Sequence, residues 1–221
     1  MIELKSLSKT YCVTGRAIQA VHQLDLTIGD GDFISIVGHS GSGKSSLLSL
    51  IGGIAKPDTG TVMVDGENIG EYDDRRLSRL RNSKFGFVYQ FASLIPTLTA
   101  LENVLLPTVF GEKRPVGQAK RLLDLVGLGD KADRYPSQLS GGEQQRVSIA
   151  RAFINAPRVV LADEPTGDLD EETEEEIMSF FEKMNREDGV TMIMVTHSSE
   201  LSLRATRLLR MKHGVLEDIS R

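Results

Sequence analysis

The sequence predicts an α/β fold with a mixed, mainly parallel sheet, an antiparallel β layer and a helical subdomain. Three observations support this prediction. An apolar run at 33–37 is followed by a glycine-rich loop and a helix-forming segment. Apolar runs at 159–163 and 191–195 have the composition of buried strands, and between about 98 and 128 the pattern becomes helical.

Composition is that of an ordinary globular protein, with 221 residues, 40% hydrophobic and 26% charged. The net charge of −5 argues against broad electrostatic binding to nucleic acid. The single cysteine, Cys12, excludes an internal disulfide, fits a reducing compartment and is expected to be a small apolar filler. The N-terminus has no signal-peptide pattern, and no apolar run approaches the ~20 residues of a membrane span. We therefore expect a cytosolic protein, or one held at a membrane by another protein.

The chain shows no linker, repeat or low-complexity tract, which favours a single domain over 1–221. We expect its core and β layer at about 1–90 and 155–221, and its helical subdomain at about 91–154. Strand patterns at 2–5, 17–21, 24–28 and 61–64, with a turn at 29–32, predict the antiparallel β layer.

The segment from Gly38 to Ser45 has the spacing Gly-x-x-x-x-Gly-Lys-Ser and lies between the strand at 33–37 and a helix. This context is that of a phosphate-binding P-loop, in which backbone N–H groups and the helix N-terminus face one anion. Lys44 can reach β- and γ-phosphates and the Ser45 hydroxyl can ligate Mg²⁺; the alternative is a flexible Gly/Ser turn. The expected phosphate contacts are Gly38, His39, Ser40, Gly41, Ser42, Gly43, Lys44, Ser45 and Ser46.

The middle of the chain predicts helices around one further strand. Residues 73–84 form a basic surface helix, for which a solvated face is favoured over nucleic-acid binding. A strand at 85–89 ends at Gln90, and 118–126 has the apolar spacing of an amphipathic helix. A second glycine turn at 138–142 opens a helix that extends to about Ile154.

The last third predicts buried strands with polar residues at their ends. The strand at 159–164 ends in two acids, the Walker B arrangement, in which Asp163 binds Mg²⁺ at the edge of a parallel sheet. A loop at 165–170 precedes a helix at 171–185. The strand at 191–195 ends at Thr196 and His197, and a hairpin closes the chain.

These motifs, in this order, resemble the ATP-binding cassette (ABC) ATPases. The most specific marker is Leu139-Ser140-Gly141-Gly142, the signature sequence of that family, which lies between the P-loop and the Walker B strand. The resemblance covers about 2–214. It implies a P-loop NTPase fold with a RecA-like core, ATP and Mg²⁺ as cofactors, and ATP hydrolysis.

The resemblance also implies roles for individual residues. Tyr11 matches the aromatic residue that stacks on adenine, although a core or edge tyrosine is the alternative. Gln90 matches the Q-loop glutamine, near Mg²⁺ and the attacking water, and a hinge to the helical subdomain. Glu164 matches the general base, and His197 the switch histidine that contacts the γ-phosphate. We expect Lys44 to be catalytic as well, together with Gln90, Glu164 and His197.

The family's signature closes over ATP bound to a second subunit, which implies a homodimer that forms on ATP binding. Ser140, Gly141 and Gly142 would contact the partner's nucleotide, and Asp170 matches the D-loop aspartate that meets the partner. Closure of this dimer would be transmitted to an attached protein.

The segments 89–90, 96–104 and 161–167 resemble the lipoprotein-releasing, macrolide-export and cell-division branch of the family. This implies an integral membrane permease as partner, no nucleic acid, and a cytoplasmic protein peripheral on the inner face of the membrane. The alternatives are a soluble ABC ATPase of DNA repair or translation, and a non-catalytic nucleotide-sensing module. Repair types would show heptads between P-loop and signature, and translation types two cassettes; a sensing module would lack Glu164.

Overall fold

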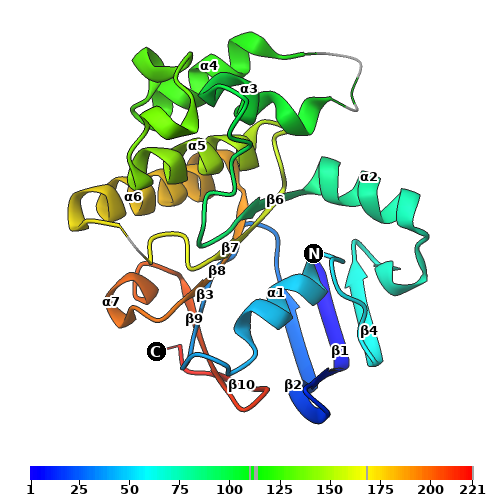
Figure 1. Cartoon of the computed structure of the whole chain (residues 1–221). Helices are drawn as coiled ribbons and strands as arrows, with labels where there is room; N and C mark the ends of the chain where they lie inside the picture. Colours follow the sequence, from blue (N-terminus) through cyan, green and yellow to red (C-terminus); the bar gives the residue numbers. More distant parts are fainter. Residues whose placement is uncertain (110, 112–113, 168, 221) are drawn as a thin grey trace.

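A computed structural model describes residues 1–109, 111, 114–167 and 169–220. Part of the expected loop at 165–170 and of the segment that joins the middle helices therefore lies outside the described residues. Figure 1 shows a sheet through the centre of the molecule, a second sheet beside it, and a group of helices at one end.

The central sheet is mixed and mainly parallel, as the sequence predicts. Its strand order is β10-β9-β3-β8-β7-β6, in which only the pairing of β10 with β9 is antiparallel among the described pairs. The strands are β3 (Phe33–Val37), β6 (Phe85–Val88), β7 (Val159–Asp163), β8 (Thr191–Thr196), β9 (Arg207–Lys212) and β10 (Val215–Asp218). Parallel pairing brings the C-terminal ends of β3, β8, β7 and β6 to one edge.

The second sheet is antiparallel, with the order β2-β1-β4-β5. Its strands are β1 (Ile2–Val13), β2 (Arg16–Ile28), β4 (Thr59–Val64) and β5 (Glu67–Asn68). This sheet is the expected antiparallel β layer.

Helices lie on both sides of the central sheet, and α3, α4 and α5 group together at one end (Figure 1). The α-helices are α1 (Lys44–Ile51), α2 (Asp74–Lys84), α3 (Ala100–Leu105), α4 (Val116–Leu125), α5 (Gly141–Phe153), α6 (Glu171–Asp188) and α7 (Ser199–Ser202). Short 3₁₀ turns are η1 (Ile69–Glu71), η2 (Leu106–Thr108), η3 (Gly129–Lys131) and η4 (Pro136–Gln138).

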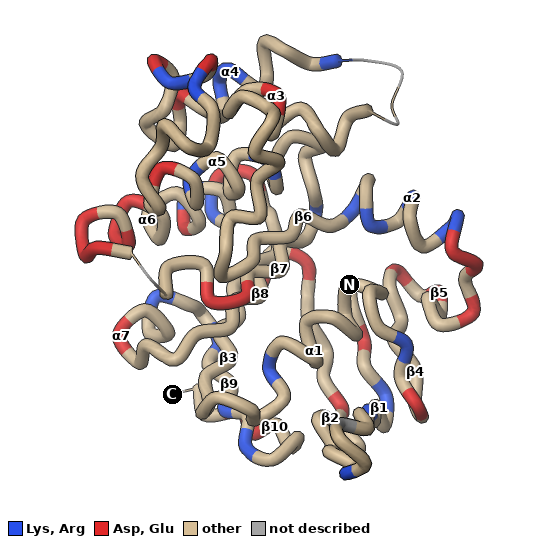
Figure 2. The backbone as a smooth tube through the Cα atoms, viewed as in Figure 1, with Lys and Arg blue, Asp and Glu red and all other residues tan. Residues whose placement is uncertain are grey.

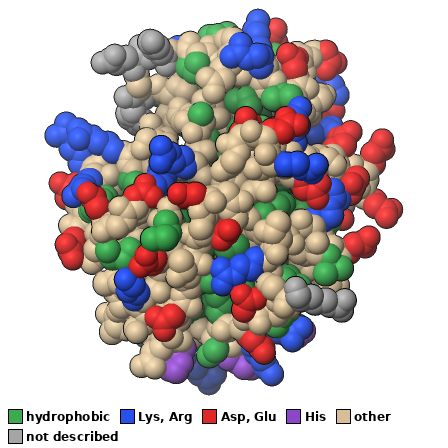
Figure 3. All heavy atoms as spheres, turned by 180° about the vertical axis from the view of Figure 1, so that it is seen from behind, with side chains coloured by type: hydrophobic (Ala, Val, Ile, Leu, Met, Phe, Trp, Pro, Cys, Tyr) green, Lys and Arg blue, Asp and Glu red, His purple; other side chains and the backbone are tan. Residues whose placement is uncertain are grey.

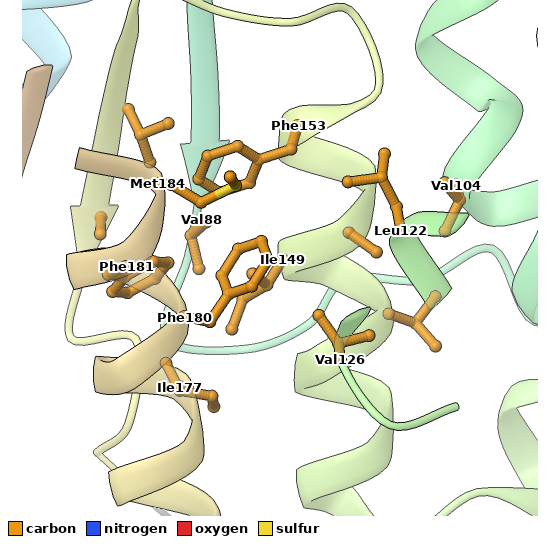
Figure 4. Packing of buried hydrophobic residues seen from close by; sticks show 14 of the residues in the cluster. Val88, Val104, Leu122, Val126, Ile149, Phe153, Ile177, Phe180, Phe181 and Met184 are labelled. Atoms are coloured by element: carbon orange, nitrogen blue, oxygen red, sulfur yellow. The ribbon is translucent and has the colours of Figure 1, made fainter. Parts of the chain in front are cut away.

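The central sheet separates two hydrophobic cores, because successive side chains of a strand point to opposite faces. In β8, Met192 and Met194 belong to the core shared with α3–α6, whereas Ile193 and Val195 belong to the core shared with α1 and the antiparallel sheet. On the first side, Phe153 of α5 meets Phe180 of α6 edge-on, with ring centroids 5.0 Å apart (Figure 4). Burial on both faces explains why these strands are continuously apolar in sequence.

Charged residues are unevenly distributed along the chain, with basic residues on α2 and acidic residues at the start of α6 (Figure 2). The acidic start of α6 complements the helix dipole. In α2, Arg76 and Lys84 form ion pairs with Glu67 and Asp65, and Arg81 donates to the carbonyl of Gly53. These contacts within the chain favour the solvated-face interpretation of α2.

Two details of the β layer differ from the sequence prediction. The segments 17–21 and 24–28 form one strand, β2, because the irregularity at Gln23 (φ 41°) is accommodated by a shift in register. Cys12 is exposed and is not an apolar filler. It pairs with Ala17 near the end of the β1–β2 hairpin, beyond the part of β1 that also pairs with β4, so no layer covers it.

Asn103 is a buried polar residue that fixes the entry into α3. Its side chain is fully buried, its Oδ1 accepts from the N–H of Ile95 at 2.7 Å, and its Nδ2 donates to the carbonyl groups of Ile95, Leu98 and Thr99. One amide therefore adds hydrogen bonds to a loop whose backbone has few others, such as those from the N–H of Leu98 to Ile95 and from the N–H of Asn103 to Thr99.

Replacing Asn103 by Leu should lower the free energy of unfolding by about 1–3 kcal/mol, because the N–H of Ile95 and the three carbonyl groups lose this partner. Urea denaturation followed by circular dichroism measures the change. Gln19→Leu, at an exposed strand position, is the matched control and should change stability by less than about 0.5 kcal/mol. Equal stabilities of the two variants would contradict this account of Asn103.

Candidate functional site

The glycine-rich loop leaves β3 and opens α1 in close contact with β2 and β9. A Cβ atom on Gly38 would lie 2.3 Å from the carbonyl oxygen of Met211, and one on Gly43 would lie 1.9 Å from that of Ala20. Gly43 also has a φ of 109°, in the region that favours glycine. The two fixed glycines of the motif are therefore required by the packing of the loop, which a merely flexible turn would not need.

Lys44 lies inside this loop. Its residue is only 6% exposed, and its Nζ donates to the carbonyl groups of Gly38 (2.7 Å) and His39 (3.1 Å). At the start of α1 no side chain of the described residues caps the helix, and its first turn contains no acidic residue. Unpaired N–H groups and a buried ammonium thus converge on one place, an arrangement that attracts an anion.

The remaining loop residues differ in exposure. His39, Ser40, Gly41 and Ser45 are exposed, Ser46 is half-buried, and Ser42 is buried. A ligand that approaches the loop from solvent can therefore reach its backbone over most of its length.

Asp163 ends β7 beside this loop. Burial raises the pKa of its carboxyl group and so does the charge of Glu164, whereas a hydrogen bond with Ser45 and the charge of Lys44 act in the opposite direction. Its Oδ1 is buried and has no hydrogen-bond partner among the described residues. An orphaned carboxylate oxygen next to a serine hydroxyl has the donor chemistry that fits Mg²⁺.

Glu164, His197 and Gln90 are brought together at the same sheet edge. Glu164 has a φ of 49° and its N–H donates to the carbonyl of Val195 on the neighbouring strand (2.9 Å). The Oε2 of Glu164 lies within hydrogen-bonding distance of His197 Nδ1. A Cβ atom placed on Gly167 would lie 3.6 Å from that Oε2 and 3.7 Å from Gln90 Nε2, so both side chains reach the same glycine.

Ser140, Gly141 and Gly142 form the start of α5. The Ser140 hydroxyl accepts from the N–H of Glu143 (3.2 Å) and the Glu143 carboxylate accepts from the N–H of Ser140 (2.7 Å), which is a capping box. Lys131 pairs with Glu143 and lowers the pKa of its carboxyl group. A Cβ atom on Gly142 would lie 3.2 Å from Thr173 of α6.

Asp170 is the cap of that neighbouring helix. Its carboxylate accepts from the N–H of Thr173 (2.9 Å) and from the Thr173 hydroxyl (2.8 Å), and these hydrogen bonds lower its pKa. Asp170 and the start of α5 thus share Thr173 as a neighbour. The starts of α5 and α1 lie in different parts of the molecule (Figure 1), so the chain alone does not bring its two glycine turns together.

Tyr11 lies on β1, opposite Ile18 of β2 and two positions along β2 from Ala20, which contacts the phosphate loop. It is half-buried, and the ammonium of Lys9 lies 5.5 Å from the centre of its ring. This position agrees with both sequence interpretations, the stacking aromatic and the edge tyrosine.

Gln145 of α5 was not singled out from the sequence. It is 3% exposed, and its Nε2 donates to the backbone carbonyl groups of Tyr89 (2.8 Å) and Pro165 (3.0 Å), the neighbours of Gln90 and Glu164. No local pattern distinguishes a glutamine of this kind from an exposed one.

A cavity of about 490 Å³ lies away from these residues, between the end of α4, α5 and α6. Its lining includes Val126, Ile149 and Phe180, and none of the candidate site residues. On the face shown in Figure 3, acidic side chains gather at the edge where α6 begins. The candidate site is therefore an open sheet edge that lies apart from this cavity.

Residues 21–167 match the family model described as ABC transporter. An uncharacterized ABC transporter ATP-binding protein of Thermotoga maritima is 44% identical, over all of this chain and 95% of the relative. The lipoprotein-releasing system ATP-binding protein LolD of Shewanella denitrificans is 42% identical, over 98% of this chain and 94% of the relative. The dimeric, ADP- and phosphate-bound structure of the ATP-binding cassette MJ0796, a protein of Methanocaldococcus jannaschii, superposes over the whole of both chains with a TM-score of 0.92 and 42% identity.

Replacing Asp163 by Asn should stabilise the ligand-free protein at pH 7. The folded-state pKa is raised above the ordinary value of 3.8, so the native state takes up a proton more readily and ionisation of Asp163 destabilises it. The contribution of Asp163 to stability is fully present below 3.8 and is lost as pH rises through the folded pKa of this residue. The increase in stability caused by Asp163→Asn should therefore be present at pH 7 and become smaller as pH falls towards 3.8. Thermal unfolding from pH 4 to pH 8 measures this increase. A variant less stable than the wild type at pH 7 would contradict this expectation.

Proposed function

This chain belongs to the family of ABC transporter ATP-binding subunits, and from this premise we propose that it hydrolyses ATP and drives a membrane partner by closure of a homodimer. The observation that carries the proposal is the convergence of a phosphate loop, an orphaned carboxylate and a Glu–His pair at one sheet edge. Lys44 and the N–H groups of 38–46 bind the β- and γ-phosphates. Tyr11 stacks on the adenine.

Ser45 and Asp163 hold Mg²⁺, with Gln90 beside them. Two observations support this assignment. The Oδ1 of Asp163 is buried and has no partner among the described residues, and the carboxylate forms a hydrogen bond with Ser45. Among the described residues no cluster of His, Cys, Asp and Glu could hold a metal by itself. Oxygens of a bound nucleotide would supply further ligands to an ion held by Ser45 and Asp163. When bound, the metal ion neutralises charge that develops on the phosphates.

Glu164 acts as the general base. It follows Asp163 directly and its carboxylate is oriented by His197, so a water held against the γ-phosphate would lie between the base and the phosphate loop. His197 also contacts the γ-phosphate, and Gln90 positions the water.

ATP is bound between two copies of the chain. The helix α5, which Ser140 caps, lies apart from α1 and its phosphate loop (Figure 1), and Gly142 and Asp170 both contact Thr173. We infer that this surface meets the nucleotide of a second copy, as the dimeric structure of the similar cassette MJ0796 suggests. The helical subdomain at about 91–154 then moves with the signature turn.

The membrane partner contacts the segment that follows Gln90. Phe91 is 69% exposed and Ile95 is 41% exposed, which provides an apolar surface next to the catalytic glutamine. Within the described part of the chain, no helix has the length and apolar character needed to cross a bilayer. We propose a cytoplasmic location on the inner face of the membrane through an integral membrane permease, and the similarity to LolD favours lipoprotein release.

Replacing Glu164 by Gln should leave ATP binding intact and lower kcat by about 100-fold or more, because the amide cannot accept the proton of the attacking water. Phosphate release measures turnover and equilibrium titration measures binding. The variant should also elute as a dimer with ATP and as a monomer without it. Hydrolysis by the Glu164→Gln variant near the wild-type rate would show that another residue is the base. A wild-type protein that binds ATP without hydrolysing it would support a nucleotide-sensing module.

Two inactive variants should complement each other if ATP lies between two chains. Lys44→Ala disables the phosphate loop, and Ser140→Arg places a cation at the signature surface. In a mixed dimer one site carries both changes and the other carries neither. Random pairing makes about half of the dimers mixed, so at most about a quarter of the sites recover. Hydrolysis by Ser140→Arg alone, or no recovery in dimers shown to be mixed, would contradict the shared site.

A further inference from the structure

Gln145 lies on α5, within one and a half turns of the signature glycines, yet its side chain points away from the signature surface and into the protein. Its Nε2 donates to two carbonyl groups, one before Gln90 and one after Glu164. These carbonyl groups follow β6 and β7, which are neighbours in the sheet but lead into separate loops. The amide therefore joins two loops that no strand pairing holds together.

The chemistry of the contact fixes the orientation of the amide. An NH₂ group has two hydrogens, so each carbonyl oxygen receives one, whereas a flipped amide would place Oε1 against two carbonyl oxygens. Oε1 is buried and has no partner among the described residues. Only the donor end of the side chain is used, so donation to the two loops is the property that a substitution removes.

A second side chain of α5 holds the other side of Gln90. Arg151 donates from Nη2 to the carbonyl of Ala92 (2.8 Å) and from Nη1 to that of Ser93 (3.0 Å). Gln145 and Arg151 thus attach the backbone on both sides of Gln90 to α5. Of these two side chains, Gln145 is the one that also contacts the loop carrying Glu164.

We propose that Gln145 is a positioning residue that fixes Gln90 and Glu164 relative to each other and to the signature helix. This inference rests on the proposed function. Because α5 begins at Gly141, directly after its cap Ser140, a movement of the signature turn against a second chain is transmitted through one amide to both loops. Gln145 is buried, and it acts through the backbone carbonyl groups of Tyr89 and Pro165, which adjoin Gln90 and Glu164.

Replacing Gln145 by Met keeps the length of the side chain and removes both donors. We expect kcat for ATP hydrolysis to fall about 10- to 100-fold, because small displacements of catalytic groups have effects of this size. KM for ATP and the affinity for ADP should change by less than about twofold, because the contacts of Lys44 are not altered. A merely structural role would move all of these values together with the melting temperature.

Gln118→Met is the matched control. Gln118 also donates from Nε2 to a backbone carbonyl, that of Ile154 (3.0 Å), and lies on α4 away from the candidate site. The Gln118→Met variant should have a lower melting temperature than the wild type, but an unchanged kcat at 25 °C. Gln145→Asn keeps the amide but shortens it, so it cannot reach both carbonyl groups. It should lower kcat with little change in KM even if the Met variant does not fold.

Each outcome decides the inference. A selective loss of kcat in the Gln145 variants supports it. Three results would overturn it: wild-type kcat in either folded Gln145 variant, a loss of ADP affinity equal to the loss of kcat, or the same loss of kcat in Gln118→Met. In each of these cases, hydrolysis by the wild type would still support the proposed function. Absence of hydrolysis in the wild type, with its partner supplied, would overturn both.

Discussion

The parallel pairing of β3, β8 and β7 is the constraint on which the rest of the structure depends. Val37 pairs with Thr196, and Val195 with Asp163, so the three strands end at one edge. The phosphate loop, His197 and Glu164 each follow one of these ends directly. Backbone hydrogen bonding thus brings together groups that are up to about 160 residues apart in sequence, and burial of the strands on both faces makes the register rigid.

The candidate site contains features that are unfavourable for folding. Within the described part of the chain, Asp163 keeps an unpartnered buried oxygen, Glu164 has a left-handed backbone, and Lys44 is almost fully buried and donates to carbonyl oxygens alone. Each feature is maintained because the two hydrophobic cores on either side of the sheet fix the strands that carry them. A bound phosphate and cation would satisfy these same groups, so the ligand-free form is prepared for them.

The start of α5 is capped by side chains and still has open space beside its backbone. In the isolated chain, the Ser140 hydroxyl and Glu143 complete a capping box, and Lys131 holds Glu143 in place. Gly141 remains exposed, and a Cβ atom on it would meet nothing within 4 Å. The turn is therefore well ordered yet leaves room for a large ligand that arrives from outside the chain.

Patterns that are local in sequence were sufficient to predict the mixed parallel sheet, the phosphate loop and the start of α5, because strand alternation, glycine spacing and capping act between near neighbours. The requirement for Gly43, by contrast, comes from Ala20 on another strand. Cys12 was placed wrongly because its exposure depends on where β4 ceases to pair with β1. Gln145 was missed because its partners lie 56 and 20 residues away and are backbone carbonyl groups, which carry no sequence signal. Sequence thus determined which residues are candidates for the proposed chemistry, and tertiary packing decided how they are held, since long-range hydrogen bonds and burial exist only after the strands have paired.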